Sequence, residues 1–321
     1  MRKWRSRLPL ILLGVIVLMV MVSHVLSLIA MSLFYQGVSS WNEKRWDPAM
    51  ARFSVAVKLS TIATWLNPWN ARAYLCRGIT CTVDGSIDGP RNRAMSDLTT
   101  AIRLNPREPL AYANRGLHYS SRKQYDLAVA DFTKSLELNP KDTWNFPDNN
   151  QPFAHLKRAE AYVKQGRPDL AEADYTAALE SKPGSVYAYS ARAEFYLKEG
   201  RADLAEADHN TAITRNPNDA NAYASRANFY ERQNRYDQAM ADITTAITLD
   251  PKGQWYSYLD RGRLYEKQGN YNLAEADFTT AIKLRPDLFW CYRDRGDFYE
   301  RQGKHDLAAA DFAKSKERGG Y

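Results

Sequence analysis

Histidines, cysteines and arginines are the side chains of this sequence that could bind a metal, attack a substrate or hold an anion. No HExxH or CxxC motif occurs, and four of the histidines are spread along the chain: His118, His155, His209 and His305. Cys76 and Cys81 lie five residues apart on an expected helix, where their side chains point in different directions. The sequence therefore predicts no catalytic, cofactor-binding or metal site, and we expect no enzymatic activity.

Arginine and aspartate recur together in a regular pattern. The arginines occupy one position in seven consecutive segments: Arg77, Arg115, Arg158, Arg192, Arg226, Arg261 and Arg295. An aspartate follows sixteen residues later in six segments and twenty later in the first: Asp97, Asp131, Asp174, Asp208, Asp242, Asp277 and Asp311. On antiparallel helices these residues can face each other, and a guanidinium can bind a carboxylate through two parallel hydrogen bonds. We expect structural ion pairs, because each carboxylate cancels the field of its arginine; a row of arginines that binds an anionic ligand is the alternative.

An internal repeat supplies the elements that carry these pairs. Segments 125–140 and 271–286 are identical at nine of sixteen positions. The prolines that close the repeated segment are spaced by 34, 43, 34, 34 and 35 residues: Pro106, Pro140, Pro183, Pro217, Pro251 and Pro286. Small and aromatic residues recur at i, i+4 and i+7 on two successive stretches of each unit, as in Tyr112, Gly116 and Tyr119. Each unit is therefore predicted to be a helical hairpin, with a residue such as Gly200 in the left-handed conformation at its turn.

These residues resemble the tetratricopeptide repeat family, in which an aromatic, a small residue and a tyrosine on one helix precede alanine, an aromatic, alanine and a closing proline. One unit holds Tyr258, Gly262, Tyr265, Ala274, Phe278, Ala281 and Pro286. The resemblance implies an all-α, right-handed α-solenoid of about seven hairpins. The expected units are 71–108, 109–151, 152–185, 186–219, 220–254, 255–288 and 289–321, and the array is expected to end there because Lys316 replaces an apolar residue. A degenerate unit is expected within 34–70, with Gly37, Ala49, Phe53 and Ala56 in register.

The resemblance also implies that a protein or peptide partner binds in the groove lined by the first helix of each hairpin. Helical spacing predicts an apolar part of this groove: Leu75, Ile79, Leu110, Leu117, Phe153 and Leu156. It predicts a polar part farther along the chain: Asn221, Asn228, Arg232, Arg263, Arg293 and Arg301. Packing of the apolar set between hairpins is the alternative. A loop around Trp144 is a further candidate for partner contact.

An apolar segment near the amino terminus predicts a membrane anchor. Leu10 to Met31 is almost wholly apolar, and its 22 residues would span about 33 Å as a helix. We expect a transmembrane helix over 8–33 after a basic tail, 1–7; the apolar stretch of a cleaved signal peptide, the alternative, is normally shorter, about 7 to 15 residues. Four basic residues before the segment predict a cytoplasmic amino terminus and an extracytoplasmic repeat domain: Arg2, Lys3, Arg5 and Arg7.

Charge and motifs together favour a non-enzymatic scaffold that binds a protein through its groove. The formal charge is +7, but 40 basic and 37 acidic residues follow Arg7, so we expect no nucleic-acid partner. Because no catalytic motif is found, we also expect no small-molecule substrate. Two alternatives stay open: an accessory subunit of an envelope enzyme or of a secretion or assembly machine, and a self-associating structural protein.

Overall fold

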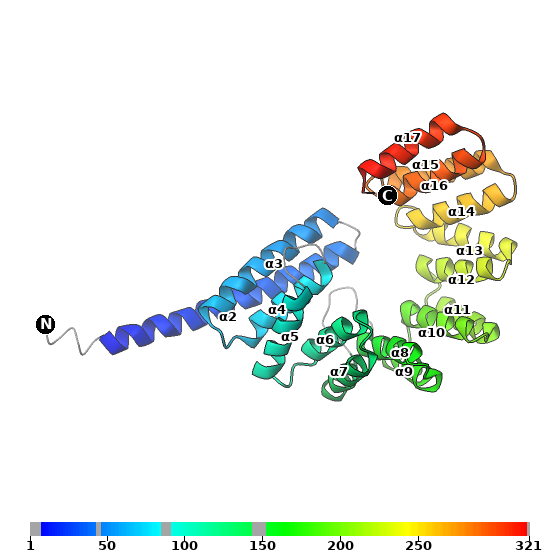
Figure 1. Cartoon of the computed structure of the whole chain (residues 1–321). Coiled ribbons are helices and arrows are strands. Elements are labelled where there is room, and N and C mark those ends of the chain that lie inside the picture. The colour runs from blue at the N-terminus through cyan, green and yellow to red at the C-terminus, as the bar shows by residue number, and fades with distance from the viewer. Residues whose placement is uncertain (1–7, 43–45, 85–90, 143–151, 320–321) are drawn as a thin grey trace. The chain divides into compact units, whose positions relative to one another are not determined.

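The computed structural model describes residues 8–42, 46–84, 91–142 and 152–319, and every regular element within these ranges is an α-helix (Figure 1). The expected all-α array of helical hairpins is confirmed. The predicted basic tail, 1–7, lies outside the described residues.

The helices fall into two compact units, Met1–Pro183 and Gly184–Tyr321. The first contains α2 (Leu8–Asn42), α3 (Trp46–Leu66), α4 (Ala71–Asp84), α5 (Arg91–Leu104), α6 (Pro109–Ser121), α7 (Tyr125–Leu138), α8 (Phe153–Lys164) and α9 (Pro168–Ser181). The second contains α10 (Val186–Lys198), α11 (Ala202–Arg215), α12 (Ala220–Arg232), α13 (Tyr236–Leu249), α14 (Trp255–Lys267), α15 (Tyr271–Leu284), α16 (Phe289–Arg301) and α17 (His305–Glu317). Each even-numbered helix packs most extensively against the odd-numbered helix that follows it. We call these the first and second helix of a hairpin.

The hairpin turns need one residue in the left-handed region. Gly166, Gly200, Gly269 and Gly303 have φ angles of 69°, 76°, 77° and 71°, as expected for the residue that ends a first helix. Glycine adopts this conformation without steric cost, which is why the repeat places it there.

A close approach between the two helices fixes how each hairpin packs. A Cβ atom added to Gly116 would lie 2.8 Å from the Phe132 ring, closer than real Cβ contacts allow, so the glycine makes room for the ring. Gly37 faces the ring of Phe53 in the same way, at 2.5 Å, and Phe53 is fully buried. The α2–α3 pair therefore uses the same contact as the later hairpins, in the segment where a degenerate repeat was expected.

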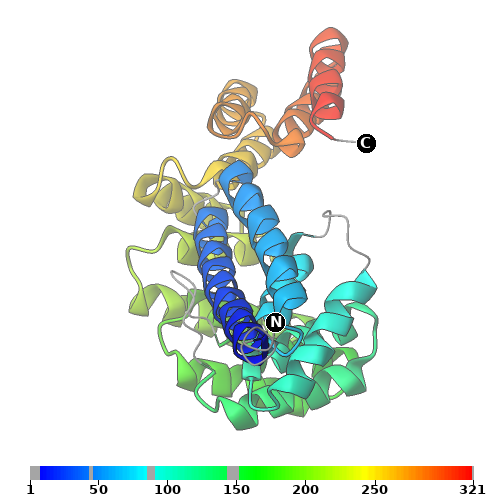
Figure 2. The same cartoon turned by 90° about the vertical axis from the view of Figure 1, so that its left-hand side faces the viewer.

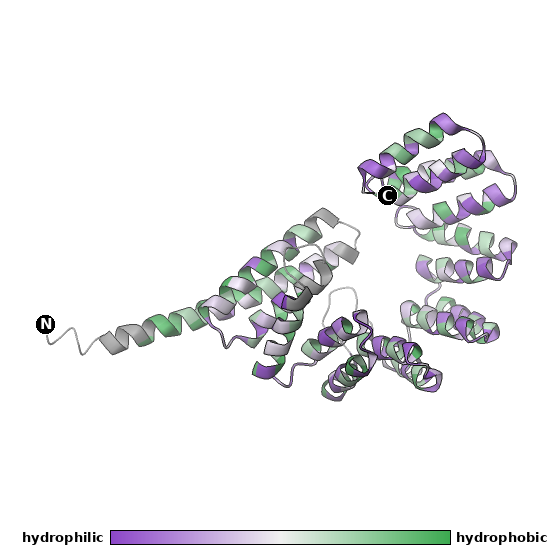
Figure 3. Ribbon diagram, viewed as in Figure 1, coloured by the Kyte–Doolittle hydropathy of each residue, from purple (hydrophilic) through white to green (hydrophobic). Residues whose placement is uncertain are grey.

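The apolar helix and this first hairpin share one element. α2 continues without a break through residue 33, the predicted end of the transmembrane segment, as far as Asn42. Ser23, Ser27 and Ala30 are fully buried on its inner face, whereas Leu13 and Val15–Val22 are exposed. Figure 2 shows α2 and α3 side by side, and Figure 3 shows the hydrophobic stretch of α2 that extends beyond α3. The helix therefore has no break between residues 33 and 34, where the membrane segment was expected to end and the first repeat to begin.

Candidate functional site

Every one of the seven arginines binds the aspartate of its own hairpin through two nitrogens. In the α12–α13 hairpin, Nε and Nη2 of Arg226 donate to the two carboxylate oxygens of Asp242 over 2.7 and 2.8 Å. The other six pairs have the same geometry, with distances from 2.6 to 2.9 Å. Arg77 and Asp97, twenty residues apart, form such a pair as well, because the longer turn between α4 and α5 leaves their hairpin positions unchanged.

The remaining guanidinium nitrogen joins neighbouring hairpins. Nη1 of Arg158 donates to Thr133 on α7 over 2.9 Å, and Nη1 of Arg295 donates to Thr279 on α15 over 3.0 Å. Nη1 of Arg226 donates to Oδ1 of Asn210 on α11 over 2.7 Å. One side chain thus holds both its own second helix and the second helix of the preceding hairpin.

Tyrosine rings pack around these guanidinium groups. The central carbon of the Arg261 guanidinium lies 5.5 Å from the ring centroid of Tyr258 and 5.8 Å from that of Tyr265. The hydrogen bond to Asp277 is the main reason why the pKa of Arg261 is raised. With two nitrogens bound to a carboxylate and at least one tyrosine ring nearby, these arginines have the geometry of structural ion pairs and leave little of the guanidinium for an anionic ligand.

A second set of charges lies on the first helices of the Gly184–Tyr321 unit. Arg263 on α14 donates to Asp260 over 2.6 Å and to Asp294 on α16 over 2.7 Å. Further pairs join neighbouring first helices: Arg232 with Glu194, Lys267 with Glu231, and Arg301 with Glu266. Several of these side chains are about half exposed. Because exposed ion pairs are screened by water, each of them contributes little stability. Their exposed atoms remain accessible to a partner.

Asp260 has a carboxyl group whose pKa is perturbed in the folded protein. Burial raises the pKa of its carboxyl to about 6; Arg263 acts in the opposite direction, but the nearby carboxylates Glu231 and Asp294 add to the increase. Arg263 bonds to both Asp260 and Asp294, and Lys267 bonds to Glu231, so burial and not a lack of cations is the main cause of the raised pKa.

A pocket opens between two neighbouring first helices of the same unit. It has a volume of about 210 Å³ and is lined by Ser190, Ala193, Glu194 and Leu197 of α10, His209 of α11, and Ser225, Asn228, Phe229 and Arg232 of α12. Among the described residues, Oγ of Ser190 and Nδ1 of His209 are buried without a hydrogen-bond partner. Burial lowers the pKa of His209 to about 4, assisted by Arg226, so its ring is neutral at physiological pH. We call this the α10–α12 pocket.

His209 was not singled out as a binding residue from the sequence, although a signal was present. It directly follows the paired aspartate, Asp208, and at this position the other hairpins have Leu98, Phe132, Tyr175, Ile243, Phe278 and Phe312. A polar side chain at a position that is apolar in the other hairpins indicates that this hairpin has a function beyond packing. The ring of His209 packs 5.4 Å from that of Phe229, as an aromatic residue would.

The structure places the two predicted parts of the groove differently. In the polar part, Asn228 and Arg232 line the α10–α12 pocket, Arg293 is exposed, and Asn221 accepts a hydrogen bond from the Tyr256 hydroxyl over 2.8 Å. In the apolar part, Leu75, Ile79 and Leu156 are only 4%, 2% and 1% exposed. The prediction that they line an open groove is therefore wrong, and they pack inside the array, which was the alternative.

Other apolar candidates are partly accessible. Leu117 and Phe153 are half-buried, and Phe153 packs against the core of the first unit. Leu110 is buried, at 7% exposed, and the edges of Leu75 and Leu110 contribute to the wall of a depression beside α2, which also includes Leu28, Met31 and Tyr35. The loop around Trp144 lies outside the described residues.

Stacked helical hairpins with one repeated packing geometry define the class: the protein is an α-solenoid. Tetratricopeptide repeat models match residues 109–142, 156–212, 210–241 and 255–288. The chain is a member of the tetratricopeptide repeat family, which serves as a scaffold for protein–protein interaction and is typically non-catalytic.

Individual relatives resemble the chain over part of their length. Human tetratricopeptide repeat protein 6 is 32% identical over 96 residues, which is 30% of this chain and 16% of the relative. The crystal structure of yeast Tom70 superposes with a TM-score of 0.74 at 19% identity, covering 90% of this chain and 60% of Tom70. A tetratricopeptide repeat protein from Parabacteroides merdae has a TM-score of 0.51 at 23% identity, covering 77% of this chain and 93% of its own. These two structural likenesses concern the fold alone.

The ion-pair ladder predicts a large loss of stability when one arginine is removed. Arg226→Met should lower the free energy of unfolding by about 3 kcal/mol, because it leaves the carboxylate of Asp242, 8% exposed, without its partner. The measurement is chemical denaturation of the full chain, followed by circular dichroism.

Arg232→Met is the matched control in the same helix. Its ion pair with Glu194 is roughly 40% exposed on both sides, so the change should cost about 1 kcal/mol or less. Equal effects of the two substitutions would contradict a structural role for the ladder.

Asp260 predicts a pH-dependent stability with a defined sign. Because its pKa is raised in the folded state, its proton favours folding at low pH, and that contribution is lost as the pH rises through about 6. Asp260→Asn cannot ionise and should therefore melt at a higher temperature than the wild type at neutral pH. The difference should disappear below about pH 4, near the ordinary pKa of aspartate. A stabilisation that is the same at both pH values would contradict the assignment.

Proposed function

We propose that this protein is a membrane-anchored scaffold that binds a segment of another protein on the first-helix face of its Gly184–Tyr321 unit. The observation that carries the proposal is the α10–α12 pocket with its two buried, unpartnered polar atoms, Oγ of Ser190 and Nδ1 of His209. Leaving such groups unpaired costs free energy, which a bound side chain or backbone group would recover. The interaction role of the repeat family supports the same conclusion.

The size of the pocket favours a side chain of a peptide over a cofactor. Its volume of about 210 Å³ lies below the range of about 300 to 1,000 Å³ that is usual for small-molecule sites. The pocket suits an uncharged side chain that can form hydrogen bonds. The ring of His209 is neutral, and the charges of Glu194 and Arg232 compensate each other in an ion pair. The proposed partner is therefore an extended segment that lays one such side chain between α10 and α12.

The proposed anchor is the apolar first part of α2, Leu10 to Met31, because α2 is long and apolar enough to cross a membrane by length and composition. The positive residues before it favour a cytoplasmic amino terminus, so the repeats would face the extracytoplasmic side of the membrane. The proposed domains are then the basic tail, the α2 anchor and the repeats that follow it.

Asn228→Trp tests the binding face, because Asn228 is exposed at the pocket and a large ring there would cover the pocket. Random displayed peptides would first be selected on the full chain held in nanodiscs, and their affinities then measured by fluorescence anisotropy. Asn228→Trp should weaken the selected peptides at least about tenfold, equivalent to 1.4 kcal/mol.

The matched control is Asn272→Trp, the same change at an exposed position of a second helix, α15. It should leave the affinities unchanged. Equal binding by Asn228→Trp would place recognition elsewhere. Failure to select any peptide, together with a multimeric mass by light scattering, would favour the self-associating alternative.

The proposed orientation predicts the result of a protease experiment. Protease added to cells stripped of their outer layers should digest the repeats, whose turns are accessible, while the cytoplasm remains sealed. Immunoblotting with an antibody against the repeats follows the digestion. Full protection until the cells are lysed would contradict an extracytoplasmic repeat domain.

A further inference from the structure

The end of α3 is fixed to one point of the apolar helix. Oγ of Ser23 donates to the carbonyl oxygen of Ala63 on α3 over 2.7 Å. Nδ2 of Asn70, just before α4, donates to the carbonyl oxygen and Oγ of Ser23 over 3.1 and 2.9 Å. All three residues are buried. The turn between α3 and α4 therefore lies level with Ser23.

The part of α2 that projects beyond this point is too short to cross a bilayer alone. Residues 8–22 would extend about 22 Å as a helix, whereas the hydrocarbon core is about 30 Å thick. A span of about 20 residues that begins near Leu10 would end near Ile29. Val25, Leu28 and Ile29 are 52%, 44% and 44% exposed although they lie in the part of α2 that packs against α3. The exposed apolar surface of α2 therefore continues past Ser23. If α2 crosses the membrane, the end of α3 must then lie at the membrane surface or just beneath it.

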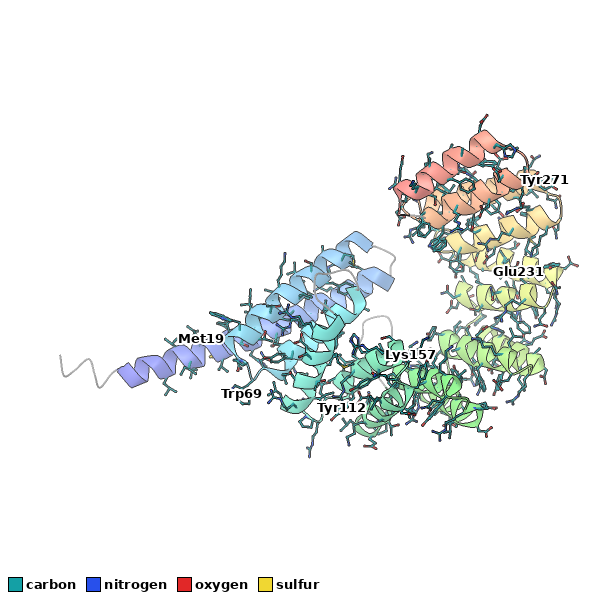
Figure 4. All side chains as sticks on the ribbon, in the orientation of Figure 1. Met19, Trp69, Tyr112, Lys157, Glu231 and Tyr271 are labelled. Atoms are coloured by element: carbon teal, nitrogen blue, oxygen red, sulfur yellow. The ribbon has the colours of Figure 1, made fainter. Side chains whose placement is uncertain are left out.

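Two tryptophans lie at this end of the hairpin. Trp65, in the last turn of α3, is 76% exposed, and Trp69, in the turn to α4, is 74% exposed. In Figure 4, Trp69 lies at the α3–α4 turn, near the part of α2 that carries Met19. Ile62, one turn before Trp65, is 47% exposed. Tryptophan rings are enriched at membrane interfaces, where the indole N–H meets the headgroups and the ring meets the acyl chains.

A basic residue accompanies the tryptophans. Arg72, in the first turn of α4, is exposed and lies two residues after Asn70. A cation at this level would be attracted by anionic lipid headgroups.

We propose that the α3–α4 turn, through Trp65 and Trp69, docks into the headgroup and acyl-chain boundary of the bilayer that α2 crosses. This inference rests on the proposed membrane anchor. The docked turn would hold the α2–α3 hairpin against the lipid surface. The first repeats would then be fixed relative to the membrane and not be connected to it by a flexible linker.

The test reconstitutes the full chain into phosphatidylcholine vesicles whose acyl chains carry bromine, a short-range quencher of tryptophan fluorescence. The chain contains eight tryptophans, so the signal of interest is obtained by subtracting the emission of the W65F/W69F variant from that of the wild type. W290F, which changes a 51%-exposed tryptophan of the other unit, is the matched control. Circular dichroism verifies the folding of each variant, and flotation of carbonate-washed vesicles measures anchoring separately.

Docking predicts that the chain floats with the vesicles and that the Trp65 and Trp69 difference emission loses most of its intensity in brominated lipid. The Trp290 difference emission should stay unquenched. Flotation with an unquenched Trp65 and Trp69 signal would overturn docking and leave the anchor standing. The same result combined with protection from aqueous acrylamide would assign the tryptophans to a protein contact and also overturn docking. A chain that does not float would overturn the anchor and docking together.

Discussion

The bidentate bond between arginine and aspartate is the interaction on which the rest of the structure depends. Each guanidinium binds the second helix of its own hairpin, and Arg158, Arg226 and Arg295 also reach the second helix of the preceding hairpin. The pair is largely buried, so its geometry must be satisfied for the chain to fold, and removing one partner leaves a charge without compensation. This requirement fixes the register between helices. It also occupies two nitrogens of each of these arginines, so we assign the proposed recognition to other side chains.

The α10–α12 pocket lies between two first helices, but the repeat departs from its own pattern at a residue of a second helix, His209 of α11. Most hairpins place an apolar, usually aromatic, residue after the paired aspartate, and a small residue such as Gly116 or Gly262 makes room for it. His209 keeps the packing role of a ring but adds nitrogen atoms, and Nδ1 finds no partner among the described residues. His209 therefore places an unpaired polar atom in an otherwise apolar core and contributes a polar wall to the α10–α12 pocket. The neighbouring ion pairs, Arg192 with Asp208 and Arg226 with Asp242, remain intact. Functional sites are where such local inconsistencies are expected.

Periodic features could be predicted from the sequence because each depends on residues within one hairpin. The turn glycines and the pairing of Arg77 with Asp97 across a longer turn follow from position in the repeat. The groove could not be predicted equally well, since helical spacing identifies a face but not what covers it. Ile79 and Leu156 are covered by neighbouring helices, a fact that depends on packing between hairpins. The residue at which the membrane segment of α2 ends cannot be determined from the sequence for a similar reason: an apolar residue looks the same whether lipid or α3 covers it.

In the proposed division of roles, the ion pairs between first and second helices hold the array together, while the first-helix face of the Gly184–Tyr321 unit binds the partner. Hydrogen–deuterium exchange of the full chain in nanodiscs, with and without a selected peptide, tests this division most directly. The account predicts that the peptide slows exchange in α10 and α12 and leaves α13 and α15 unchanged. Slower exchange confined to second helices, or to the Met1–Pro183 unit, would contradict it.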